Sequence, residues 1–93
     1  MSYTKLTSNA DLFEYLTRLA EEFIKQDMLE VADKLLQANR FATGSPSEFF
    51  QEAQVVLRVV KTTCRARLTE AQLEDIDGVI EQIESAFRRI GGA

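Results

Sequence analysis

Residues 45–64 read SPSEFFQEAQVVLRVVKTTC, and the other predicted helices are organised around this stretch. Ser45 is a favourable N-cap residue, Pro46 suits the first helical position, and Glu48 lies at the capping-box spacing from Ser45. Apolar and small residues then recur at steps of three and four in two adjacent rows: Phe49, Ala53, Val56, Val60 and Thr63, beside Phe50, Leu57 and Cys64. This sector is wider than a surface helix needs, so we expect a helix with neighbours on more than one side.

Two helices are predicted before this stretch. Ser8 can cap the first, over residues 9–26, and the second covers residues 28–42. The residues expected on their inner faces recur with the helical period: Leu12, Leu16, Leu19 and Phe23 in the first, then Val31, Ala32, Leu35, Leu36, Ala38 and Phe41 in the second. Gly44 can end the second helix in a left-handed conformation.

The boundary between these two helices is the least obvious one in the chain. Asp27 followed by Glu30 repeats the spacing of a capping box, which predicts a break after Gln26 and a new helix from Met28. Neither Gly nor Pro forces a helix to stop there. One continuous helix from residue 9 to 41 is therefore the alternative.

A last helix is predicted over residues 70–90. Thr69 and Gln72 have the spacing of the capping box that opens it, and apolar residues within it step by three or four. The β-branched residues between Val55 and Leu68 could instead form a strand. We reject that alternative because the sequence contains no second strand to pair with it.

Together these patterns predict an all-α fold, either a four-helix bundle or two packed helical hairpins, with helices at about 9–26, 28–42, 46–66 and 70–90. We expect a single domain over residues 1–93, with loosely ordered ends at 1–7 and 91–93. Residues 46–64 are expected to be its most buried element.

Composition excludes several classes of function. The chain has 93 residues, a formal net charge of −4, a pI near 4.8, one cysteine and no histidine. Nucleic-acid binding needs concentrated basic charge, and histidine is the commonest general base and a common metal ligand. No apolar stretch reaches membrane-spanning length. We therefore expect a soluble cytoplasmic protein that is not an enzyme and that binds no nucleic acid, membrane, metal or cofactor.

Four residues match the third, fifth, sixth and twelfth positions of a calcium-binding EF-hand loop: Asp75, Asp77, Gly78 and Glu84. The first position, where a carboxylate ligand is needed, is Leu73, and the same residues fit an unbroken helical row. We therefore interpret the acidic residues as the exposed face of the last helix. Cys64 lies on an apolar helix face with no histidine to activate it, which indicates a buried structural cysteine.

Arg58, Lys61 and Arg65 form a basic stripe at spacings of three and four. They could bind an acidic partner or a phosphate group, or they could pair internally with the acidic residues of the last helix. Charge is segregated along the chain: residues 41–67 carry four basic and two acidic side chains (+2), and residues 68–93 carry two basic and six acidic ones (−4). This asymmetry suits an internal match, partner selection or dimer register.

These observations favour a small non-enzymatic protein-interaction module, such as an adaptor, regulator or inhibitor, whose partner is another protein or a second copy. One alternative is a self-associating structural domain, a homodimer that covers the wide apolar sector of residues 46–64. By analogy of size and charge alone, another is an acidic immunity-type inhibitor of a basic toxin. A small-molecule binder with a cavity near Phe49, Val56 and Leu57 is the weakest candidate, because nothing polar there would orient a ligand.

Overall fold

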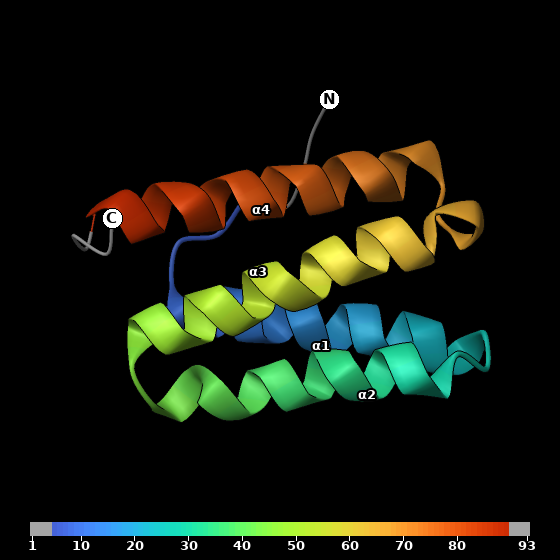
Figure 1. Cartoon of the computed structure of the whole chain (residues 1–93), viewed down its shortest axis with the longest axis horizontal. Helices are drawn as coiled ribbons and strands as arrows, with labels where there is room; N and C mark the ends of the chain where they lie inside the picture. The colour runs from blue at the N-terminus through green and yellow to red at the C-terminus, as the bar shows by residue number, and fades with distance from the viewer. Residues whose placement is uncertain (1–4, 90–93) are drawn as a thin grey trace.

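The computed structural model describes residues 5–89, and all regular secondary structure in this range is helical. The four α-helices are α1 (Asn9–Lys25), α2 (Leu29–Ala38), α3 (Pro46–Thr63) and α4 (Glu70–Arg89). Two short 3₁₀ helices, η1 (Asn39–Thr43) and η2 (Arg65–Arg67), follow α2 and α3. The predicted all-α fold with four helices is confirmed, and helices that are consecutive in the chain pack side by side (Figure 1).

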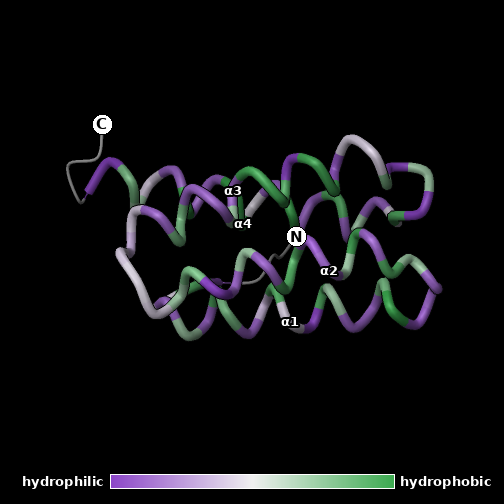
Figure 2. Tube along the Cα trace, turned by 60° about the horizontal axis from the view of Figure 1, so that its bottom comes forward, coloured by the Kyte–Doolittle hydropathy of each residue, from purple (hydrophilic) through white to green (hydrophobic). Residues whose placement is uncertain are grey.

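The core lies between the helices and is built from their apolar rows. Figure 2 shows hydrophobic and hydrophilic segments alternating along each helix, as expected when one face is buried. Each of α1, α3 and α4 contributes five buried residues, and Phe23, Phe49 and Ile76 are among the largest of these side chains. With Cys64 directly after α3, residues 46–64 supply six residues of the hydrophobic core, against five from α1 and four from α4, which agrees with the prediction that this stretch is the most buried element.

The break between α1 and α2 is where the sequence predicts it, but its cause is different. Asp27 has a φ of 63°, in the left-handed region. The backbone N–H of Met28 donates to the Phe23 carbonyl (2.8 Å) and that of Asp27 to the Ile24 carbonyl (3.0 Å), which is the Schellman pattern of a helix C-terminus. The N-cap of α2 is Met28 and makes no side-chain capping bond, so the predicted capping box at Asp27 is wrong.

Of three further predicted helix caps, one is confirmed and two are wrong. Thr69 and Gln72 form the predicted capping box, because each side chain accepts from the other's backbone N–H (3.1 and 2.9 Å). Ser45 is the N-cap of α3 but caps no backbone N–H with its side chain, so the predicted box with Glu48 is wrong; its hydroxyl pairs with a serine hydroxyl two residues later. The predicted left-handed Gly44 is also wrong, since its φ is −100°.

Both α2 and α3 end before the predicted limits at residues 42 and 66. α2 ends at Ala38 and the chain continues as η1. α3 ends at Thr63, where the hydroxyls of Thr62 and Thr63 donate to the carbonyls of Arg58 and Val59 (3.0 and 2.8 Å), four residues earlier. This back-bonding weakens and bends helices, which accounts for the tighter 3₁₀ turn that follows.

Residues 5–8 run from the start of α1 to α4 (Figure 1). The Leu6 backbone N–H donates to Gln82 Oε1 (2.8 Å), and the Leu6 side chain packs against the core. Part of the predicted loose N-terminal end is thus held in place. The remaining predicted loose ends, 1–4 and 91–93, lie outside the described residues.

The start of α1 is fixed by a small hydrogen-bond network. Asp11 Oδ2 accepts from the hydroxyl and the backbone N–H of Thr7 (2.6 and 2.8 Å), and Ser8 Oγ accepts from Asp11 N (3.3 Å) in the predicted N-cap. The Thr7 hydroxyl, followed by the Thr7 backbone, holds the pKa of the Asp11 carboxyl below its ordinary value, because both donors stabilise the charged form. The chain therefore enters α1 along a defined path.

Candidate functional site

The three residues of the predicted basic stripe have different surroundings. Arg58 forms an ion pair with Glu84, and Lys61 Nζ lies 2.5 Å from Asp77 Oδ1. Arg65 is exposed in η2, and no ion pair engages it within residues 5–89. Two of the three charges are thus matched by α4, in agreement with the internal alternative. A docking role for Arg58, Lys61 and Arg65 stays a prediction.

These pairs join the outer edges of α3 and α4. Glu84 also accepts from Gln54 Nε2 (2.9 Å), so one carboxylate connects two side chains of α3. The charged groups are one-third to one-half exposed, and surface pairs of this kind contribute about 0–1 kcal/mol each. They therefore contribute little to stability, but they give Arg58 and Lys61 partners within the molecule.

The calcium-loop motif and Cys64 have the places expected for structural residues. α4 is continuous through Asp75, Asp77 and Glu84, so this segment forms no calcium-binding loop. Over residues 5–89, no three His, Cys, Asp or Glu side chains gather closely enough to hold a metal ion. Cys64 is 2% exposed and free, which confirms the predicted buried cysteine.

Large apolar side chains are exposed on α2 and on the two helices that pack against it, α1 and α3. Within residues 5–89, five are between 41% and 58% exposed: Phe13, Ile24, Leu29, Leu36 and Val55. Leu29 and Leu36 belong to α2, and Ile24 precedes it across the turn. Asn39, the first residue after α2, donates from its side-chain amide to the Phe13 carbonyl (3.3 Å). The N-terminal half of α1 therefore lies next to the C-terminal end of α2. We call these five residues the α2 face.

An apolar groove runs between α2 and α3. It consists of two adjoining hollows of about 350 and 230 Å³, which share Lys34, Val56 and Val59. Val55 and Phe41 line the larger one. A groove with apolar walls between two helices can bind the apolar face of an amphipathic helix from another protein.

The prediction that Leu36 lies on the inner face of its helix is wrong, because its side chain is 41% exposed. α2 buries Ala32, Leu35 and Ala38, and Leu36 is rotated by about 100° from Leu35, beyond the arc that α1 and α3 cover. The apolar sector of α2 is wider than its neighbours require. An apolar sector wider than a buried helix face needs is the one feature of the sequence that could have predicted the α2 face.

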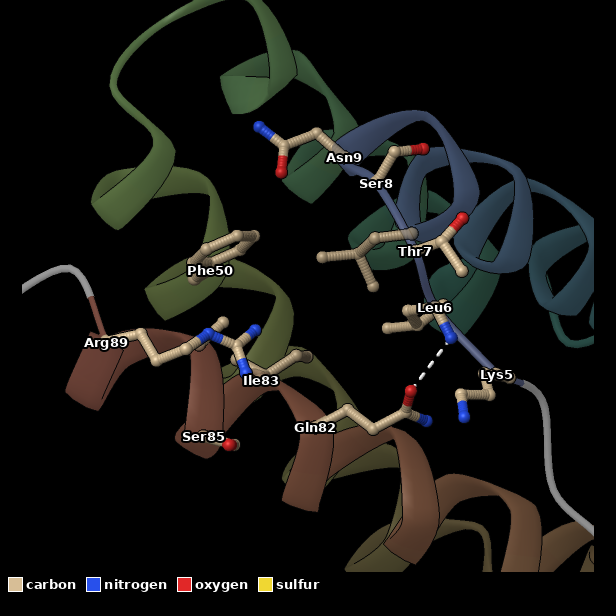
Figure 3. A pocket seen from close by; sticks show the side chains of 12 residues that line it. Lys5, Leu6, Thr7, Ser8, Asn9, Phe50, Gln82, Ile83, Ser85 and Arg89 are labelled. Carbon is tan, nitrogen blue, oxygen red and sulfur yellow. Dashed lines mark hydrogen bonds between the residues drawn. The ribbon is translucent and has the colours of Figure 1, made fainter.

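A separate hollow of about 330 Å³ lies where residues 5–9 approach α3 and α4; we call it the N-terminal pocket. Its apolar wall is formed by Leu6, Leu12, Phe50 and Ile83. Figure 3 shows the Arg89 side chain extending from the end of α4 toward Phe50 and Ile83, and Lys5 on the opposite side, near Gln82. The Phe50 ring also packs edge-on against Phe87, with ring centroids 6.2 Å apart.

Of the three residues predicted to surround a core cavity, only Val56 lines a hollow within residues 5–89, the groove between α2 and α3. Phe49 and Leu57 are fully buried and Val56 is nearly so, because all three belong to the packed core. The N-terminal pocket opens beside Phe50, on the edge of α3 that faces α4. Polar side chains are present there, which the predicted core position lacked.

A second hollow of about 370 Å³ also lies between α1 and α4. Tyr15, Glu21 and Glu22 line it from α1, and Asp75 from α4. Burial raises the pKa of the Tyr15 phenol, and the negative charge of Asp75 raises it further. The two hollows therefore differ in charge, because the N-terminal pocket is lined by Lys5 and Arg89.

The chain matches no protein-family model, and comparison with curated proteins and with solved structures finds no significant match. Among the described helices, none has the length and apolar content that crossing a membrane requires.

Proposed function

We propose that this protein is a small, non-enzymatic protein-interaction module of the cytoplasm, an adaptor, regulator or inhibitor that binds its partner through the α2 face. The observation that carries the proposal is the exposure of five large apolar side chains on α2 and on the two helices that pack against it. Single exposed apolar residues are ordinary, whereas several large ones on consecutive packed helices, beside an apolar groove, are typical of an interface.

The distribution of charge supports the choice of this side. On the α3–α4 side, Arg58 and Lys61 are already paired with Glu84 and Asp77. A partner that bound there would have to break these pairs or cover them, and covering a charged pair is costly. The α2 face carries the larger gain, because burying apolar surface contributes about 25 cal/mol per Å².

Binding rather than catalysis is the role that these residues suit. The chain has no histidine, and its one cysteine is buried without a base beside it. The groove beside Val55 and Val59 is apolar along its walls, with Lys34 and Glu52 at its edge. We infer that the partner presents an apolar ridge, such as one face of an amphipathic helix.

Affinity capture from the native cells tests this proposal with two matched variants. Leu36→Asp places a charge in the α2 face, and Ala71→Asp places the same charge on an exposed position of α4. We expect a stoichiometric partner with the wild type and with Ala71→Asp, and its loss with Leu36→Asp, all three proteins having the same circular dichroism. Identical recovery from all three would contradict the proposal. Recovery of a second copy alone would make the protein a homodimer.

A further inference from the structure

We propose that the N-terminal pocket binds a small carboxylate with an apolar body, such as a medium-chain or aryl carboxylic acid. No residue of α2 lines this pocket, so the inference is independent of the α2 face. The proposal rests on three features of the pocket: its charge, its apolar wall and its size.

The charge of the pocket is opposite to that of the whole protein. The chain carries −4, yet no Asp or Glu is among the residues that line the pocket, and Lys5 and Arg89 are. No ion pair engages Arg89 within residues 5–89, in contrast to Arg58 of the same α3–α4 pair of helices. Lys5 also borders a hollow lined by the carboxylates of Asp11 and Glu14, whereas Arg89 does not. Arg89 is therefore the cation more available to an anion in the N-terminal pocket.

The guanidinium of Arg89 selects the kind of anion. Its planar fork matches the two oxygens of a carboxylate, with which it forms two parallel hydrogen bonds. In Figure 3 the Arg89 side chain runs from the end of α4 back toward Ile83 of the same helix. A carboxylate held there would direct the rest of the ligand toward Phe50 and Leu6.

The wall and the volume select the body of the ligand. Leu12 and Ile83 are almost fully buried and form the floor, while Leu6 and Phe50 are half-buried and form the sides. A volume of about 330 Å³ is at the small end of the range of ligand pockets, about 300–1,000 Å³. An unbranched chain or one aromatic ring suits this space better than a nucleotide or a sugar phosphate.

Ser8 and Asn9 at the pocket's edge and the bond from Leu6 N to Gln82 complete the site. The bond keeps residues 5–8 against α4, so the pocket exists before the ligand arrives. Because Gln82 accepts this bond, its role is to hold Leu6 in the wall of the pocket. Loss of the segment would open the pocket to solvent.

Titration of the isotope-labelled full chain with octanoate, followed by ¹H–¹⁵N NMR, tests the inference. We expect saturable shifts of the amides of Leu6, Ile83 and Ala86, with a Kd on the order of 1 mM for a ligand of this size. Octanol, which has the same chain without the charge, is the ligand control and should bind about tenfold more weakly.

Three substitutions complete the test. Arg89→Glu should weaken octanoate binding about tenfold or more, while Arg88→Glu, the same charge change on an exposed neighbour outside the pocket, should leave it unchanged. Ala86→Leu fills the pocket and should abolish binding in a protein that keeps its spectrum. Shifts that do not saturate, or equal binding by Arg89→Glu and Arg88→Glu, would overturn the proposal.

Discussion

Asp27 allows a direct test of why α1 and α2 are separate helices. Its φ of 63° lies in the region that costs an ordinary L-residue about 1–2 kcal/mol and that glycine adopts freely. Aspartate tolerates this region better than alanine because its short polar side chain bonds locally. We therefore expect Asp27→Gly to stabilise the protein and Asp27→Ala to destabilise it.

The difference between the two variants gives the magnitude. Alanine bears the left-handed cost of about 1–2 kcal/mol, whereas glycine loses about 0.5–1 kcal/mol through the greater freedom of its unfolded chain. Asp27→Gly should then exceed Asp27→Ala by about 1 kcal/mol in the free energy of unfolding. For a domain of this size, that is a difference of about 4–8 °C in Tm.

The assay is thermal unfolding followed by circular dichroism, with Gln26 as the matched control. Gln26 has a φ of −93°, so there the alanine variant should be the more stable one. The expected result is thus a reversal of order between two adjacent positions. A continuous helix through residue 27 predicts alanine above glycine at both positions, and that outcome would refute our account of the break.

Three further predictions concern the core, the start of α1 and the surface pairs. Leu57→Ala should lower the free energy of unfolding in urea by about 2–5 kcal/mol, because Leu57 is fully buried; a loss below about 1 kcal/mol would contradict the packing described. Thr7→Val should raise the pKa of the Asp11 carboxyl, measured by NMR; since that pKa is depressed in the folded state, the bond's contribution is present above the ordinary pKa and is lost as the pH falls through the folded value. Lys61→Met should cost less than about 1 kcal/mol, because its pair with Asp77 is half-exposed, and a larger loss would show that the pair is a major source of stability.

The fold could be predicted because its signals are local and repeated. The apolar rows through Phe49 and through Leu12 recur with the helical period, and Thr69–Gln72 forms a box whose partners are three residues apart. The left-handed Asp27 could not be read in the same way, because a Schellman end depends on backbone bonds that any residue can make. Sequence therefore located the break and misassigned its cause.

The surfaces were predicted less well, because they depend on how the helices are rotated against each other. The period of α2 places Leu35 and Leu36 in one broad apolar sector, and only the packing of α1 and α3 determines that Leu35 is buried while Leu36 is exposed. The N-terminal pocket is lined by both Lys5 and Arg89, which are the first and last residues of the described chain. No pattern along the sequence connects residues that far apart.

In-cell photo-crosslinking shows whether the α2 face contacts another protein. A photoreactive phenylalanine analogue at Leu36 reports on the α2 face, and the same residue at Ala71 reports on the exposed side of α4. We expect one discrete adduct from position 36 and none from position 71, with the adduct mass giving the size of the partner. No adduct from position 36, or the same adducts from both positions, would contradict the account.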